Sequence, residues 1–132
     1  MTALAGGCLC GAVRYAVEDD FRYALTCHCS QCRRATGSAS KTFGGIPRDA
    51  LAITQGADRL LIWGDAEDAA DVRCGTCGSL LWSIVRAGEW VHVTYGTLDT
   101  TPAKRPHDHI FATSKADWET ICDGLPQHEA YS

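Results

Sequence analysis

Short runs of strand-forming residues, some of them alternating between apolar and polar, recur along most of the chain. They lie at residues 11–17, 21–26, 38–45, 51–54, 59–63, 80–85 and 90–95, with glycine or proline between several of them. Alternation over a few residues predicts strands with one buried face, and residues 90–95 show it most clearly. Many short strands with frequent glycine predict an all-β fold.

The segments between these runs predict loops and little helix. Residues 64–71 are small and acidic, which predicts an exposed loop or hairpin tip. Residues 97–106 contain Pro102 and Pro106 and predict a further loop, because proline cannot donate to a strand ladder. Ser114 can cap one or two helical turns through residues 115–118. With 45% hydrophobic composition over 132 residues, we expect one globular domain spanning residues 1–132.

Composition limits the compartment and the partners. The amino terminus lacks a charged region followed by an apolar core, and no apolar run reaches the length of a membrane span. We therefore expect a cytoplasmic protein, in which eight reduced cysteines at motif spacing favour metal over disulfides. The formal charge of −4 argues against nucleic acid binding. We expect neither nucleic acid nor membrane as a partner, and both a monomer and a homodimer stay open.

Three cysteines lie within six residues, at Cys27, Cys29 and Cys32. Cys27 and Cys29 point to the same side of an extended segment, so His28 between them is a poor further ligand. A turn through residues 30–31 can bring Cys32 back to complete a trio that holds zinc. Three protein ligands leave a fourth position open, which is typical of catalytic zinc. A redox cluster, an incomplete structural site and thiols that merely pack are the alternatives.

A second set of cysteines has the spacing of a closed zinc site. Cys74 and Cys77 are followed by Gly78, which lets the backbone turn tightly and aim amide groups at the sulfurs. Cys8 and Cys10 offer the matching half. Four cysteine ligands leave no open position, so this set predicts structural zinc, and buried thiols without metal are the alternative.

The remaining chemistry-bearing residues give weaker signals. Arg33 and Arg34 follow the trio and could attract substrate carboxylates, although an exposed solvated pair is equally consistent with the sequence. His107 and His109 adjoin the proline-containing loop, where either could orient a substrate or serve the fold. We name His109 as a candidate substrate contact. Cys122 stands alone and predicts a small buried apolar side chain.

Several motifs together resemble one known family. They are Gly-Cys-Leu-Cys-Gly-Ala-Val at residues 7–13, Cys-His-Cys-Ser-Gln-Cys-Arg at 27–33, Cys-Gly-Thr-Cys-Gly at 74–78, Gly-Thr-Leu-Asp at 96–99, His-Ile-Phe at 109–111, Ser-Lys-Ala-Asp-Trp at 114–118 and Asp-Gly-Leu-Pro at 123–126. With these neighbours in this order, the chain resembles the glutathione-dependent formaldehyde-activating (GFA) family over nearly its whole length. The same domain occurs in centromere protein V. Arg73 departs from the family pattern, because an aromatic residue is expected before Cys74.

The resemblance implies a fold, two metal ions and an activity. It implies a β-tent of short antiparallel strands with zinc-binding knuckles and little helix. It also implies two zinc ions per chain, a structural one on Cys8, Cys10, Cys74 and Cys77 and a second one on Cys27, Cys29 and Cys32. The family activity adds glutathione to formaldehyde and is that of a carbon–sulfur lyase acting in reverse. We therefore expect a small thiol and a small aldehyde as partners. A non-catalytic zinc-binding module and a thiol-based redox sensor are the alternatives.

Overall fold

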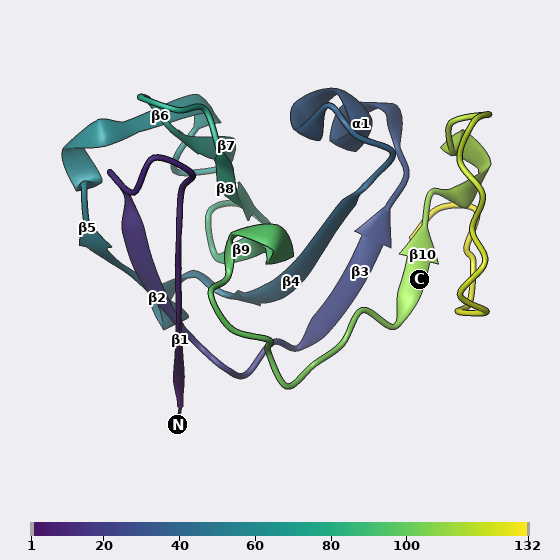
Figure 1. Ribbon diagram of the computed structural model, residues 1–132, viewed down its shortest axis with the longest axis horizontal. Helices are drawn as coiled ribbons and strands as arrows, with labels where there is room; N and C mark the ends of the chain where they lie inside the picture. Colours follow the sequence, from purple (N-terminus) through teal and green to yellow (C-terminus); the bar gives the residue numbers. More distant parts are fainter. Residues whose placement is uncertain (1, 132) are drawn as a thin grey trace.

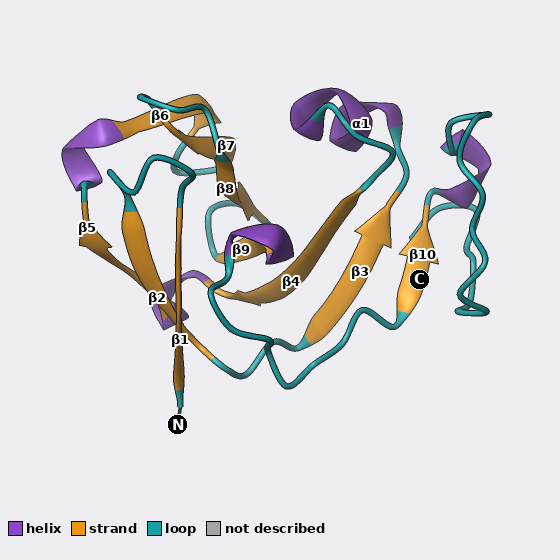
Figure 2. Ribbon diagram, in the orientation of Figure 1, coloured by secondary structure: helices purple, strands orange, loops and turns teal. Residues whose placement is uncertain are grey.

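The computed structural model describes residues 2–131, and its strands form two sheets (Figures 1 and 2). The smaller sheet has the order β1 (Ala3–Gly7), β2 (Arg14–Glu18) and β5 (Leu51–Gln55). The larger sheet has the order β10 (Asp108–Ile110), β3 (Tyr23–Cys27), β4 (Lys41–Pro47), β9 (Trp90–Thr94), β8 (Leu80–Val85), β7 (Ala69–Cys74) and β6 (Leu60–Asp65). All neighbours are antiparallel except β10, which runs parallel to β3. The expected all-β fold is confirmed.

Helical segments are short. The one α-helix of the described residues is α1 (Ser30–Thr36), which lies beyond the ends of β3 and β4 in Figure 1. Single 3₁₀ turns occur at η1 (Arg48–Ala50), η2 (Ala57–Arg59), η3 (Tyr95–Thr97) and η4 (Ala112–Ser114). Within residues 2–131, no helix has the length and apolar composition needed to cross a membrane.

The two sheets share one buried cluster. Val17 of β2 and Val93 of β9 both belong to it, and each is almost wholly removed from solvent. The Tyr15 and Trp82 rings meet edge to face across the sheets, with centroids 5.6 Å apart. Such aromatic pairs contribute about 0.5–1.5 kcal/mol beyond their buried area. The interpretation of residues 1–132 as one domain stays a prediction, with which this shared core agrees.

Two glycines inside β4 admit aromatic rings onto the strand. A Cβ atom at Gly45 would lie 2.1 Å from Cζ of Tyr23, and one at Gly44 would lie 2.6 Å from the Phe21 ring. The sequence predicted that these glycines close a strand, but they lie in its middle and Pro47 is its last residue. The packing of rings on the strand, rather than a turn, explains them.

Residues 69–71, predicted as part of an exposed loop, belong to β7 instead. The hairpin turn is confined to residues 66–68, and β7 pairs with β6 and β8 on either side. Ala70 and Val72 are buried in the common core, which outweighs the acidic composition of the preceding residues. β1 was also not predicted, because its residues are small and carry little alternation.

One predicted helix is absent, and one observed helix was predicted only as a turn. Residues 115–118 form no helix, and Ser114 ends the η4 turn rather than starting a helix. Just before these residues, the backbone pairs with the C-terminal segment, since the Ala112 N–H donates to the His128 carbonyl. Conversely, the predicted turn after Cys29 continues as α1 until Gly37 ends it in a left-handed conformation.

Candidate functional site

Four thiols from two distant turns meet in one cluster. Cys8 and Cys10 follow β1, while Cys74 and Cys77 lie at the end of β7 and in the turn before β8. Their sulfur atoms all lie within 4.8 Å of one another. The Sγ atoms of Cys8 and Cys10 are 3.7 Å apart, and those of Cys10 and Cys74 are 3.8 Å apart. Tetrahedral zinc with sulfur ligands requires about 3.8 Å between sulfurs, so this set fits the ion.

Backbone amides point at the sulfurs of this cluster. The Val13 N–H donates to Sγ of Cys8 at 3.3 Å, and the Cys77 N–H donates to Sγ of Cys74 at 3.5 Å. A hydrogen bond from the Ser79 hydroxyl lowers the pKa of the Cys77 thiol to about 5. Gly78 has a φ of 83°, a left-handed conformation that a side chain would strain. These contacts favour the thiolate forms that bind metal.

Arg73 connects this cluster to α1. Its Nη1 donates to the Gly78 carbonyl at 3.0 Å, and its Nη2 donates to the Ala35 carbonyl near the end of the helix. A planar guanidinium presents donors in two directions, which a ring in the same place could not do. The departure from the family pattern at residue 73 therefore supplies a contact between the two cysteine sites.

The second thiol cluster lies where β3 passes into α1. Cys27 ends β3, Cys29 is the N-cap of α1 and Cys32 lies in its first turn. Their three sulfur atoms lie within 4.8 Å of one another. The Cys32 N–H donates to Sγ of Cys29 at 3.3 Å, so one contact both caps the helix and holds two of the thiols.

Hydrogen bonding within the trio favours one thiolate even without metal. The Cys32 thiol donates to the sulfur of Cys27, and this bond lowers the pKa of Cys27 to about 6. The pKa of Cys32 is raised for the same reason, since it keeps the shared proton. A divalent metal would displace that proton, because ligating thiols are deprotonated. The trio thus fits a soft metal such as zinc with three sulfur ligands and one free position.

A cavity of about 680 Å³ opens beside the trio. Pockets of about 300–1,000 Å³ are typical of small-molecule sites. The walls combine the three cysteines with aromatic side chains and a few polar groups. The aromatic residues are Phe43, Trp63, His92, Phe111 and Tyr131, and the polar ones include Lys41, Asp71 and Ser83.

A buried lysine lies in the cavity wall. Lys41 keeps only 6% of its surface exposed, and its Nζ donates to Oγ of Ser83 at 2.6 Å. The Ser83 hydroxyl in turn donates to Oδ1 of Asp71 at 2.6 Å. Burial lowers the pKa of Lys41, whereas the nearby Cys32 and Asp71 raise it again. Three strands, β4, β8 and β7, contribute one residue each to this chain of hydrogen bonds.

His92 forms the neighbouring part of the wall. Its ring stacks on Phe43 with centroids 4.1 Å apart, and its Nε2 lies 2.7 Å from the Tyr23 hydroxyl. Burial, together with the positive charges of Lys41 and Arg86, lowers the pKa of His92 to about 3. His92 is therefore a neutral hydrogen-bond acceptor at neutral pH.

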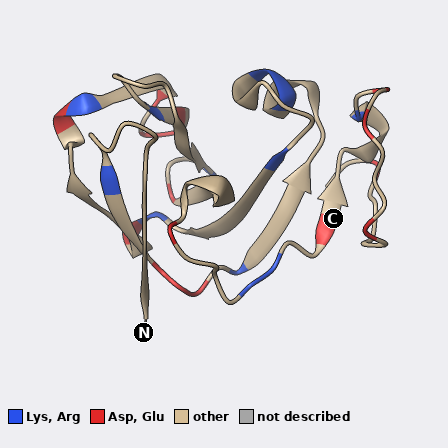
Figure 3. Ribbon diagram, viewed as in Figure 1, with Lys and Arg blue, Asp and Glu red and all other residues tan. Residues whose placement is uncertain are grey.

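The predicted substrate contacts lie elsewhere. Arg33, Arg34 and His109 are not among the residues that line the cavity. Arg34 is exposed on α1, and Figure 3 shows basic residues dispersed over several elements rather than gathered around one of them. His109 is directed to the opposite side of β3 and β10, where it contacts His28 and Asp123. Direct substrate contacts of these three residues stay a prediction that the cavity lining does not support.

Lys41 and Ser83 are among the polar cavity residues that the sequence did not single out. A signal for Lys41 was available, because it precedes Phe43 by two residues and thus shares its face of β4. A lysine on the buried face of a strand is rare unless it has a partner. No such signal existed for Ser83, whose role depends on the register of β8 against β7.

Comparisons with known proteins give a consistent result. A family model described as "Glutathione-dependent formaldehyde-activating enzyme" matches residues 3–114. A Halomonas elongata protein is 29% identical over 126 residues, which are 89% of this chain and 80% of that protein. A Podospora anserina protein is 30% identical over 91 residues, 67% of this chain but only 41% of that protein. Both are named, provisionally, as glutathione-dependent formaldehyde-activating enzymes.

A solved structure has the same fold. A crystal structure of a Rhodobacter sphaeroides protein superimposes with a TM-score of 0.62 at 29% sequence identity. The match covers 76% of this chain and 92% of the other. This likeness supports the fold.

Proposed function

Because this chain belongs to the glutathione-dependent formaldehyde-activating family, we propose that it joins a small thiol to formaldehyde or a similar aldehyde, or catalyses the reverse cleavage. The observation that carries this proposal is the trio of Cys27, Cys29 and Cys32 at the wall of a cavity of substrate size. Three sulfurs with one position left for a substrate are suited to thiol chemistry. Glutathione is the thiol that the family name suggests.

We assign one zinc ion to each cluster, a structural ion to one and a catalytic ion to the other. Cys8, Cys10, Cys74 and Cys77 would hold a structural zinc, and Cys27, Cys29 and Cys32 would hold a second zinc in the catalytic site. When bound there, zinc would supply a free coordination position that lowers the pKa of an incoming thiol. Three thiolate ligands weaken the Lewis acidity of the ion, which favours thiol delivery over carbonyl activation.

The other residues of the cavity suit the second reactant. The thiol first releases its proton to water. The thiolate sulfur then forms a bond to the carbonyl carbon, and the carbonyl electron pair moves to the oxygen, which takes a proton back from water. The net reaction consumes one thiol and one aldehyde and yields one hydroxymethyl thioether. The Lys41 ammonium uses one of its three hydrogens for Ser83, its single partner among the described residues. We assign it a hydrogen bond to the developing alkoxide.

Aromatic side chains make part of the cavity wall apolar. Phe43 and Phe111 line the cavity, and Phe43 is buried. An apolar wall strengthens the attraction between Lys41 and an alkoxide, because the local dielectric constant is low. It also accepts the apolar part of an aldehyde larger than formaldehyde.

Exchange NMR with formaldehyde and glutathione tests the proposal on reduced, zinc-loaded protein. Wild type should accelerate exchange between free glutathione and its hydroxymethyl adduct, and Cys29→Ser should return it to the uncatalysed rate. Cys122→Ser is the matched control, since Cys122 is exposed, contrary to the burial expected from the sequence, and belongs to neither thiol cluster. Acceleration that survives in Cys29→Ser would refute the assigned site.

The same samples separate the two rival functions. A non-catalytic zinc module would carry two zinc ions and show no acceleration with any thiol or aldehyde. A redox sensor would release zinc reversibly under mild peroxide and form a disulfide within the trio, which mass spectrometry detects.

A further inference from the structure

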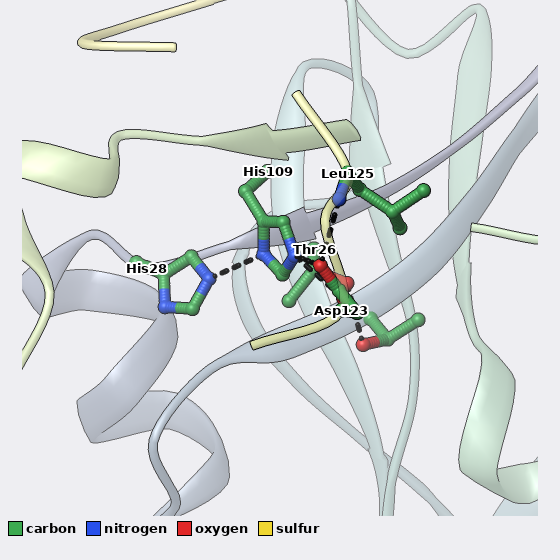
Figure 4. A network of polar contacts seen from close by, with 6 residues as sticks. Thr26, His28, His109, Asp123 and Leu125 are labelled. Atoms are coloured by element: carbon green, nitrogen blue, oxygen red, sulfur yellow. Dashed lines mark hydrogen bonds and ion pairs between the residues drawn. The ribbon is translucent and has the colours of Figure 1, made fainter. Parts of the chain in front are cut away.

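A chain of three polar side chains lies on the side of β3 and β10 opposite the cavity (Figure 4). Nε2 of His28 lies 2.8 Å from Nδ1 of His109, and Nε2 of His109 lies 2.8 Å from Oδ2 of Asp123. Both rings are buried, with 2% of His28 and 6% of His109 exposed. None of the three residues lines the cavity that contains the thiol trio.

The hydrogen bonds fix the direction of this chain. Hydrogen bonds from the Leu125 N–H and from His109 hold the pKa of Asp123 below its usual range, so Asp123 accepts only. With His109 neutral, its Nε2–H donates to Asp123 and its Nδ1 accepts the Nε2–H of His28. Each ring is thereby held in a single tautomer and a single orientation.

His28, the first side chain in this hydrogen-bonded series, lies between two thiols of the trio. His28 separates Cys27 from Cys29, and its backbone N–H donates to the Ile110 carbonyl of β10 at 3.0 Å. Its ring is held by His109, the residue before Ile110 on the same strand. Backbone and ring together anchor the peptide units that carry two of the sulfurs. Because alternate residues point to opposite sides, a fixed His28 directs both thiols into the cavity.

We propose that His28, His109 and Asp123 are positioning residues. From the side of β3 and β10 opposite the cavity, they hold the loop at residues 27–29 in its metal-binding geometry. The inference rests on the metal-binding part of the proposed function and not on the lyase reaction. It also gives His109 a different role from the substrate contact that the sequence suggested. The side chains that orient a metal ligand commonly change metal affinity by about 10- to 100-fold when removed.

The chain offers a matched control next to this network. Asp108, on the same strand as His109, pairs with Nε2 of His128 at 2.6 Å and with Nδ1 of His107 at 2.9 Å. This second Asp–His cluster has the same chemistry, but it makes no contact with His28. A general loosening of β10 would follow from breaking either cluster, whereas loss of ligand positioning would follow from breaking only the first.

Zinc release to a chromogenic chelator tests the inference on the whole reduced protein with two zinc ions bound. The open site should release zinc in a fast phase and the four-cysteine site in a slow phase. We expect Asp123→Ala, which truncates a half-exposed side chain, to accelerate the fast phase by about 10- to 100-fold and to leave the slow phase unchanged. Asp108→Ala should change neither phase, and Asp123→Asn, which keeps an acceptor oxygen, should restore much of the retention.

Several outcomes would overturn the inference. An equal effect of Asp108→Ala or an acceleration of both phases would assign the network to general stability. Wild-type zinc retention in Asp123→Ala would show that the network does not position the metal ligands. Long-range ¹⁵N NMR of the rings gives an independent readout, since wild type should show the Nε2–H tautomer for both His28 and His109. The opposite tautomers would refute the hydrogen-bond direction.

The two proposals fail separately. If zinc retention responds as expected but no thiol–aldehyde exchange is catalysed, the positioning role stands and the lyase function falls. If exchange is catalysed and depends on Cys29 while Asp123→Ala retains zinc normally, the function stands and the positioning role falls.

Discussion

At the scale of single residues, the cavity combines one cation with one neutral imidazole in a thiol-rich wall. Lys41 and His92 lie on the adjacent strands β4 and β9 and both border the cavity. Their burial acts on their pKa values in the same direction, because it disfavours the charged form of each. Cys32 and Asp71 raise the pKa of Lys41 and so favour its charged form, whereas no neighbouring group among the described residues raises the pKa of His92. The two residues should therefore respond differently to substitution.

Replacing Lys41 by Met should lower turnover much more than it raises KM. The methionine fills similar volume but cannot donate to an alkoxide, and one such donor is worth about 10²–10³ in kcat. Lys41→Arg keeps the charge and should retain part of the activity. Steady-state exchange rates at several aldehyde concentrations, with zinc content measured on each variant, distinguish this from loss of metal. An unchanged kcat in Lys41→Met would remove Lys41 from the mechanism.

His92 should make folding stability dependent on pH. Its folded pKa of about 3 lies below the usual value of 6.5, so the unfolded chain binds the proton first as pH falls. The stabilisation is complete above pH 6.5 and decreases below it, by about 2 kcal/mol at pH 5. Urea unfolding of wild type and His92→Gln at pH 7.5 and pH 5 measures the difference. Since acid-induced zinc loss weakens both proteins, only the extra loss in wild type is assigned to His92.

The residues that could be predicted from sequence are those whose partners are local. Cys27, Cys29 and Cys32 lie within six residues, so their spacing alone restricts their geometry. The place of His109 could not be found in this way. Its contacts depend on the parallel pairing of β10 with β3 and on a segment after it in the chain, and neither leaves a periodic signal.

At the scale of elements, short strands were predictable where buried and exposed residues alternate in the sequence. They were not predictable where the strand forms only because neighbouring strands pair with it. Val91 and Val93 alternate with polar neighbours in β9, and the structure has this strand within one residue of the prediction. β7 was missed because its first residues resemble the acidic turn before them, although two neighbouring strands bury alternate side chains there. α1 was missed because its cap is a thiol, Cys29, which is not a residue typical of helix starts.

Gly45→Ala should destabilise the protein through the aromatic ring packed on β4. The new methyl group would lie 2.1 Å from Cζ of Tyr23, so this ring must move. The Tyr23 ring stacks on Trp90 with centroids 5.9 Å apart, and its hydroxyl contacts His92. We expect a loss of about 1–3 kcal/mol in the free energy of unfolding.

Gly96→Ala is the control for this substitution. A Cβ at Gly96 meets no atom within 4 Å, and its φ lies outside the left-handed range. Urea unfolding should place Gly96→Ala within about 0.5 kcal/mol of wild type. If Gly45→Ala were equally neutral, the ring above β4 would be freer to shift than its contacts indicate.

At the scale of the whole molecule, the four-cysteine cluster joins the two sheets. Two of its cysteines follow β1 in the smaller sheet, and the other two lie at the end of β7 and in the turn before β8 in the larger one. Arg73 extends this connection to α1 and so to the thiol trio. The motif spacing predicted which cysteines form the cluster, but not that α1 contacts the turn that follows Cys74.

Cys10→Ser should therefore weaken the junction between the sheets. We expect loss of one of two zinc ions and a fall of about 2–5 kcal/mol in the free energy of unfolding, as for removal of a native cross-link. Hydrogen exchange should accelerate most in β1 and β2, which the metal ties to the larger sheet. Cys122→Ser should keep both ions. Full metal content and unchanged exchange in Cys10→Ser would show that the cluster does not hold a structural ion.

The separation of these ligands along the chain also bears on how the protein is made. The thiols of the trio leave the ribosome within six residues of one another, whereas Cys74 emerges 64 residues after its cluster partner Cys10. At about 5–20 residues per second, this interval lasts about 3–13 s. A nascent chain thus carries all three thiols of the trio before the four-cysteine cluster can close. If both clusters bind zinc as proposed, the trio is the first that could load it during synthesis.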